Sequence, residues 1–141
     1  MWPPAVLMAL LATLPSATRF LLNQVLRAAV AAVLVVTVCA TLLCLYWLAT
    51  DPDAALPDVP FAWTGMVALG LAVGLPVAVV FGFTVAPLSA SLGRVHPALM
   101  WLASAGGGLL LVTLMTTPKL AVLGALGGVV SAWLNRRAKA A

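Results

Sequence analysis

Four long stretches of the sequence contain no charged side chain, and they constrain the fold more than any other feature. They run over residues 28–50, 59–93, 97–118 and 120–135. A helix rises 1.5 Å per residue, so about 20 apolar residues cross a hydrocarbon core of about 30 Å. A water-soluble domain carries about 25% charged residues, whereas this chain of 141 residues carries 7%. The pattern therefore predicts a membrane protein, whose last and shortest run needs a locally thinner bilayer or help from its neighbours.

We expect an all-α membrane protein with four transmembrane helices in an antiparallel bundle, preceded by an N-terminal interfacial segment. Thr117-Pro118 offers an N-cap residue followed by a proline at the first helical position, and His96-Pro97 offers the same pair. The short connection at Thr117 predicts that the last two helices form an antiparallel hairpin. The predicted divisions are a segment over 1–16 and a transmembrane domain over 17–141, with helices at about 17–49, 62–88, 97–116 and 118–135.

The first residues, MWPPAVLMALLATLPSA, could be read as a cleaved signal peptide or as a retained segment. No basic residue precedes the apolar run, as it would in a signal peptide, so we expect the segment to be retained. Pro3, Pro4 and Pro15 leave about ten residues that can form a helix, which is too short to span a bilayer. An interfacial or partner-docked segment fits better.

Charged residues are sorted along the chain by sign. Asp51, Asp53 and Asp58 all lie between the first two predicted spans, whereas six of the seven basic residues lie near the termini or between the second and third spans. Lys and Arg stay on the cytoplasmic side of a membrane. We therefore expect a bacterial-type cytoplasmic (inner) membrane protein with both termini in the cytoplasm, with Lys119 as the exception on the outer face beside the acidic loop. The residues expected to contact lipid headgroups are Arg19, Arg27, Arg94, Arg136 and Arg137.

Aromatic residues favour the same orientation. Tyr46, Trp47, Phe61 and Trp63 flank the acidic loop, and Trp133 precedes the basic C-terminal tail. Aromatic rings with a polar edge prefer the headgroup level of a bilayer, so these residues mark the two interfaces.

Small residues recur at every fourth position of two predicted helices. Inside lipid, burial from water does not drive helices together, and close backbone approach through small side chains does. More small faces exist than four helices need for internal packing, which predicts a homo-oligomer or a larger partner. The predicted helix-contact residues are Gly70, Gly74, Ala78, Gly82 and Ala86 on the second helix, and Gly124, Gly128 and Ala132 on the fourth.

Pro76 lies within the first of these stripes. It has no N–H to donate to the carbonyl of Ala72, at a depth where water cannot compensate. Either a neighbouring helix tolerates the resulting kink, or the freed carbonyl lines a polar path.

No carboxylate, His, Lys or Arg side chain lies within residues 28–49, 64–92, 98–117 and 120–134. Proton-coupled transporters place such groups inside the membrane, so their absence argues against proton antiport by this chain alone. A single histidine, His96, cannot form a zinc or bis-histidine haem site, and Cys39 and Cys44 point about 140° apart on one helix. We expect no enzymatic activity, no catalytic residue, no metal, no cofactor and no nucleic-acid partner.

Three functions remain open. The leading hypothesis is an accessory or structural subunit of a larger membrane complex that binds through the small-residue faces of the second and fourth helices, because helix-contact patterns coexist with a lack of catalytic groups. The alternative is a homo-oligomeric channel or small-solute transporter with a path near Pro76, Thr84 and Ser104. The third is a holin-like or immunity protein. The expected partners are membrane lipids and either other integral membrane subunits or a second copy of the chain.

Overall fold

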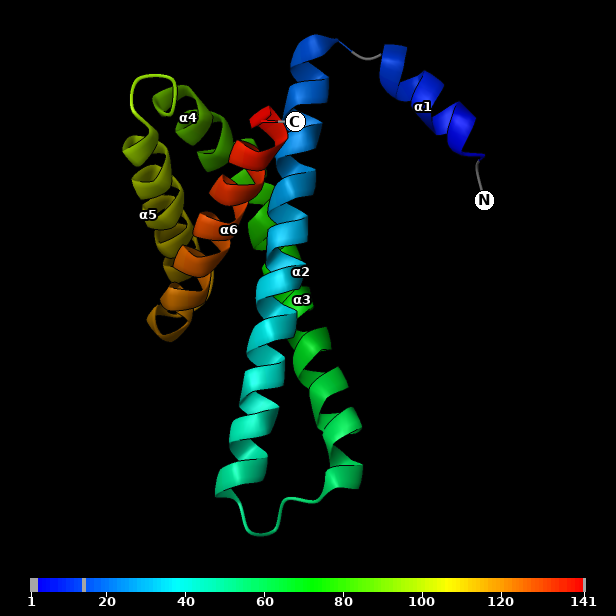
Figure 1. Ribbon diagram of the computed structural model, residues 1–141, viewed down its shortest axis with the longest axis vertical. Coiled ribbons are helices and arrows are strands. Elements are labelled where there is room, and N and C mark those ends of the chain that lie inside the picture. The colour runs from blue at the N-terminus through cyan, green and yellow to red at the C-terminus, as the bar shows by residue number, and fades with distance from the viewer. Residues whose placement is uncertain (1–2, 14, 141) are drawn as a thin grey trace.

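The computed structural model describes residues 3–13 and 15–140, which are almost entirely helical (Figure 1). Residues 1, 2 and 14 of the predicted N-terminal segment lie outside the described residues. No strand occurs in the described part of the chain. The elements in chain order are α1 (Pro4–Thr13), α2 (Ser16–Thr50), η1 (Leu56–Asp58), α3 (Val59–Phe83), α4 (Val85–Leu92), α5 (Pro97–Met115), η2 (Pro118–Leu120) and α6 (Ala121–Ala140).

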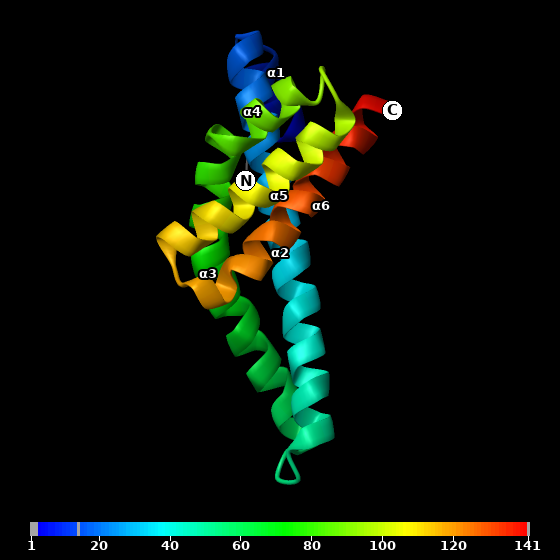
Figure 2. The ribbon, with the colours of Figure 1, turned by 90° about the vertical axis from the view of Figure 1, so that its left-hand side faces the viewer.

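Two helical hairpins of unequal length form the body of the molecule. The α2–α3 hairpin is the longer one, and the α5–α6 hairpin packs against it chiefly through α6 on α2. Figures 1 and 2 show that α5 and α6 cross α2 and α3 obliquely and end part-way along them. Beyond that point α2 and α3 continue together to the loop that joins them. α4 connects the two hairpins, and α1 lies apart from both (Figure 1).

Three segments are long and apolar enough to cross a membrane: Ser16–Thr50, Leu56–Phe83 and Pro97–Met115. The predicted fourth span, α6, is not among them. Its last two turns carry Asn135, Arg136, Arg137 and Lys139, so its apolar part is shorter than its 20 residues suggest. The chain is thus an all-helical protein with three candidate membrane-spanning helices in its described residues.

The helix expected over 62–88 is divided in two. α3 ends at Phe83 and α4 begins at Val85, with Thr84 between them. Pro87 explains the break, because it has no N–H for the Phe83 carbonyl and its ring clashes with that group. Pro76 does not interrupt α3, since α2 supports the helix on both sides of it.

The two residues that were expected to cap helices, His96 and Thr117, behave differently. The Nδ1 atom of His96 accepts a hydrogen bond from the N–H of Ala98 at 3.2 Å and caps α5. Thr117 makes no such side-chain bond; Pro118 instead opens a short 3₁₀ turn, and α6 follows from Ala121. The last helix therefore begins later than expected and extends further, to Ala140.

Small side chains form the core and allow the helices to approach closely. Ala28, Ala78, Phe81 and Ala86 make a buried cluster shared by α2, α3 and α4. A Cβ built on Gly82 would lie 2.5 Å from the Cα of Val25, so no larger residue fits there without moving α2.

Backbone meets backbone directly between α5 and α6. A Cβ on Gly128 would lie under 3.0 Å from the Ser104 carbonyl, and a Cβ on Gly124 would meet the Gly108 carbonyl as closely. Real Cβ atoms do not occupy such positions, and a backbone carbonyl cannot rotate away. These glycines set the distance between the two helices.

We predict that Gly128→Ala destabilises the protein by about 1–3 kcal/mol, because overpacking forces the backbones apart. Gly127→Ala is the matched control, since a Cβ on Gly127 has nothing within 4 Å. The measurement is the unfolding free energy in mixed micelles titrated with sodium dodecyl sulfate. Equal stability of the two variants would contradict the assignment of Gly128 to the helix contact.

Candidate functional site: a polar cluster beside an apolar cavity

A buried polar cluster joins the first and last long helices. The Nδ2 group of Asn135 on α6 donates a hydrogen bond of 3.0 Å to Oε1 of Gln24 on α2. The guanidinium of Arg27 donates to Oδ1 of the same Asn135. Gln24 and Asn135 are only 2% and 3% exposed. We name Gln24, Arg27 and Asn135 the polar cluster; it ties α6 to α2.

Helical spacing explains why these side chains meet. Gln24 and Arg27 are three residues apart and therefore lie on one face of α2, which continues through the buried Ala28 and Ala31. On α6 the glycine stripe runs at three- and four-residue intervals into Ser131 and Asn135. Because Asn135 continues the spacing of the residues that contact α5, its amide lies where α6 meets α2.

Ser131 lies one turn before Asn135 and is 1% exposed. Its hydroxyl has no hydrogen-bond partner. A buried polar group without a partner carries a cost of about 1–3 kcal/mol. Burial of the Ser131 hydroxyl therefore lowers the stability of the protein, whereas most buried hydroxyls in helices donate to a carbonyl of their own helix.

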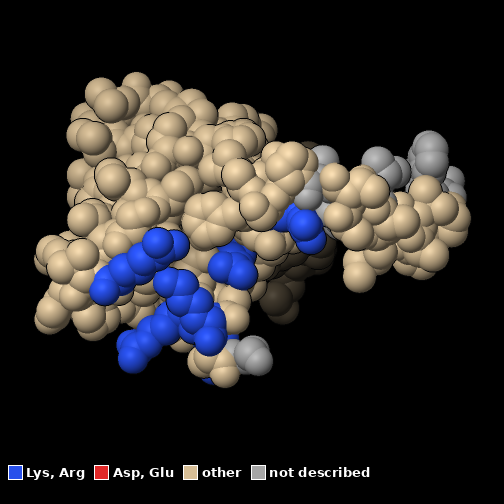
Figure 3. All heavy atoms as spheres, turned by 90° about the horizontal axis from the view of Figure 1, so that it is seen from above, with Lys and Arg blue, Asp and Glu red and all other residues tan. Residues whose placement is uncertain are grey.

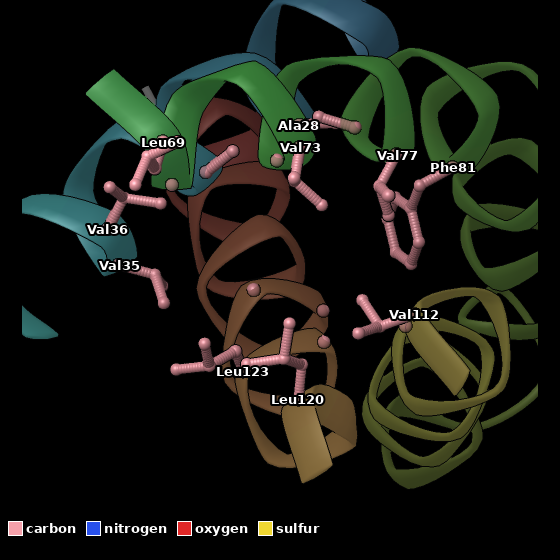
Figure 4. A pocket seen from close by; sticks show the side chains of 18 residues that line it. Ala28, Val35, Val36, Leu69, Val73, Val77, Phe81, Val112, Leu120 and Leu123 are labelled. Atoms are coloured by element: carbon pink, nitrogen blue, oxygen red, sulfur yellow. The ribbon is translucent and has the colours of Figure 1, made fainter. Parts of the chain in front are cut away.

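An apolar cavity of about 330 Å³ lies between the two hairpins, on the side of the polar cluster that faces the middle of α2. Figure 4 shows side chains from α2, α3, α5, η2 and α6 pointing into it. No ionisable, hydroxyl or amide side chain lines it. Its lining residues are Ala28, Ala32, Val35, Val36, Leu69, Gly70, Val73, Gly74, Val77, Ala78, Phe81, Gly108, Val112, Leu120, Leu123, Gly124, Gly127 and Gly128.

Glycines create this space. Gly108, Gly124 and Gly128 bring the α5 and α6 backbones together, and Gly127 on the adjacent face presents no side chain to the cavity. A Cβ on Gly127 would meet nothing within 4 Å. The close contact and the open volume therefore arise from one glycine-rich segment.

Basic residues gather at one end of the molecule. The N-terminal half of α2, the α4–α5 turn and the C-terminal end of α6 lie together in Figure 1. Figure 3, seen from that end, shows Lys and Arg side chains and no Asp or Glu. The Arg137 guanidinium lies 4.4 Å from the centroid of the Trp133 ring, a cation–π contact. The loop with the three aspartates lies at the opposite end of the α2–α3 hairpin (Figure 1).

Lys119 does not lie beside that acidic loop. It belongs to η2, at the tip of the shorter hairpin, which ends part-way along α2 and α3 (Figure 1). The neighbouring Leu120 lines the cavity together with Val36 and Leu69, near the middle of the longer hairpin. Lys119 therefore lies apart from the acidic loop, because the α5–α6 hairpin is shorter and oblique. The side of the membrane that Lys119 faces stays a prediction.

The predicted helix-contact residues face partners within the chain. Gly70 and Gly74 approach Val36, and Gly82 approaches Val25, so this stripe of α3 faces α2. Gly124 and Gly128 face α5. The three alanines of the set, Ala78, Ala86 and Ala132, are buried.

The predicted headgroup residues fall into two groups. Arg19, Arg94, Arg136 and Arg137 are exposed, whereas Arg27 is half-buried and bonded to Asn135. Sequence reasoning missed Gln24 and Asn135. The signal was present, because both amides lie beside basic residues at the ends of long apolar runs.

The far end of the long hairpin holds aromatic hydrogen bonds. Trp63 Nε1 donates to Thr41 Oγ1 at 3.1 Å and links α3 to α2, and Trp47 Nε1 donates to Asp51 Oδ2 at 2.9 Å. Cys39 and Cys44 are free thiols on α2. Among residues 3–13 and 15–140, no three His, Cys, Asp or Glu side chains are close enough to hold a metal ion.

We predict that Gln24→Leu and Asn135→Leu are not additive. Each single change leaves a buried amide without its partner, whereas the double change removes both. The double-mutant cycle, measured by the same unfolding titration, should give a coupling of at least about 0.5 kcal/mol. Simple additivity would show that the two amides do not stabilise each other.

Comparison with known proteins gave no relative: no family model, no curated protein and no solved structure matches this chain.

Proposed function

We propose that this chain is a small integral membrane protein that serves as an accessory or structural subunit of a larger membrane complex. The observation that carries the proposal is a second small-residue face on α3, which no other part of the described chain covers. The partner is another integral membrane protein that packs a helix against this face.

This outward face lies opposite the one that packs on α2. Gly65, Ala68, Ala72 and Pro76 recur at three- and four-residue intervals along α3, and all four are exposed. A Cβ on Gly65 would meet nothing within 4 Å. Small residues in such a row allow another helix to approach at backbone distance. We name these four residues the outward face of α3.

Pro76 leaves a carbonyl near the outward face without its usual helical hydrogen bond. It cannot donate to the Ala72 carbonyl, and both residues are exposed. An unsatisfied carbonyl in hydrocarbon costs several kcal/mol. A closely packed partner helix with a hydroxyl or amide side chain at this contact would supply a donor, which lipid tails cannot do.

The cavity favours this proposal over the channel or transporter alternative. Ions and polar solutes need polar groups or water along their path. Every side chain that lines the cavity is apolar. The proposal also includes no enzymatic role, since no nucleophile in the sequence has a paired base.

We propose that the protein resides in a bacterial-type cytoplasmic membrane with both termini and the basic end in the cytoplasm. The separation of the basic end from the aspartate loop supports this orientation. α1, which has ten residues and spans only about 15 Å, would lie at the membrane interface near that end.

The topology is tested with single cysteines introduced at Ala55 in the aspartate loop and at Ala138 near the C-terminus, in a Cys39→Ala/Cys44→Ala background. A membrane-impermeant maleimide applied to intact cells should label position 55 and spare position 138 until the cells are opened. Labelling of position 138 in intact cells would overturn the orientation.

The partner is tested by affinity purification from native membranes. The unaltered chain should return a stoichiometric membrane partner, and Gly65→Leu or Ala72→Leu should reduce its recovery at least about tenfold, because bulk on the outward face prevents close approach. Gly106→Leu is the matched control, since a Cβ there also has nothing within 4 Å but lies on α5. Recovery of only a second copy of the chain would favour the homo-oligomer instead.

A further inference from the structure

We propose that the apolar cavity between the two hairpins is a binding site for one acyl chain of a membrane lipid. The proposal concerns a different surface from the outward face of α3 and requires only that the helices lie in a bilayer. It would stand even if no partner subunit were found.

The lining of the cavity selects a hydrocarbon ligand. All 18 lining residues are glycine, alanine, valine, leucine or phenylalanine. Buried water is held by two to four polar partners, and no side chain that lines this space can supply one. An acyl chain leaves no polar group unsatisfied and restores the van der Waals contacts that an empty space lacks. The volume of about 330 Å³ matches the smaller ligand sites of proteins, which begin near 300 Å³.

The cavity is bounded on the side of the basic end. Ala28 marks that limit on α2, and Gln24 and Arg27 of the polar cluster follow within one turn toward the N-terminus. Their hydrogen bonds to Asn135 hold α6 against α2. A ligand in the cavity is therefore separated from the basic end by paired polar groups.

The other limit of the cavity lies near the tip of the α5–α6 hairpin. Leu120 and Leu123 line it there opposite Val36 and Leu69 (Figure 4). Val36 lies well inside the uncharged run over 28–50, at a depth that hydrocarbon surrounds when α2 spans the bilayer. Lipid acyl chains are the molecules present at that depth, so they are the occupant to which we commit.

The test uses the full-length protein in nanodiscs that contain phosphatidylethanolamine and phosphatidylglycerol, with a small fraction carrying a diazirine near the end of one acyl chain. After illumination, mass spectrometry maps the attached lipid. We expect attachment at cavity residues such as Val73, Val112 and Leu123. Attachment spread evenly over the lipid-facing residues, with no enrichment in the cavity, would overturn the proposal.

Two variants fill the cavity, and one matched variant leaves it open. Gly127→Leu and Val73→Phe add volume inside it, and each should lower cavity labelling at least about fivefold. Gly106→Leu adds the same bulk as Gly127→Leu on α5, outside the cavity lining, and should leave labelling unchanged. Circular dichroism and gel filtration identify variants that remain folded. Unchanged cavity labelling in a folded filling variant would exclude the site.

Discussion

Backbone-to-backbone contact between α5 and α6 is the constraint on which the rest of the structure depends. In lipid, apolar side chains gain little by leaving the solvent, so helices associate where their backbones come close. Gly108, Gly124 and Gly128 allow that approach, and a single Cβ at Gly124 or Gly128 would collide with a carbonyl of the facing helix. The hairpin formed in this way is short, and it crosses α2 and α3 obliquely with the cavity between the two hairpins.

The polar cluster gives this hairpin a fixed place on α2. Glycine packing defines how α5 meets α6, but apolar surfaces alone allow α6 to slide or rotate along α2. A bond between two buried amides, with a guanidinium on the second, has one acceptable geometry. The unpartnered hydroxyl of Ser131 lies one turn away on the same helix. Arg27 therefore lies near the basic end and also bonds to Asn135, whereas the side chains of Arg19, Arg94, Arg136 and Arg137 are exposed.

Much of this arrangement could be predicted from the sequence, and the rest could not be predicted for identifiable physical reasons. Uncharged runs and proline positions predict helices, and the charge pattern predicts a basic end opposite an aspartate loop. Pro76 and Pro87 each remove a helical hydrogen bond, yet only Pro87 ends a helix, at Thr84. The difference comes from the tertiary contacts that support α3 around Pro76, which the sequence does not reveal. The position of Lys119 could not be predicted, because it depends on the tilt of the α5–α6 hairpin. That tilt depends on which rows of side chains on the helices pack together. The pairing of Gln24 with Asn135 requires knowing that α6 neighbours α2.

α3 separates the two proposed binding surfaces. Leu69, Val73 and Val77 line the cavity, while Gly65, Ala68 and Ala72 are exposed on another face of α3. At 100° per residue the centres of these two faces are separated by more than a right angle. A lipid chain in the cavity and a partner helix would therefore meet only along the edge of α3 where Leu69 and Pro76 point in directions about 20° apart. Away from that edge the lipid chain could influence the partner only by moving α3 itself, and Pro76, which weakens the helix between the two surfaces, is the place where such movement would be easiest.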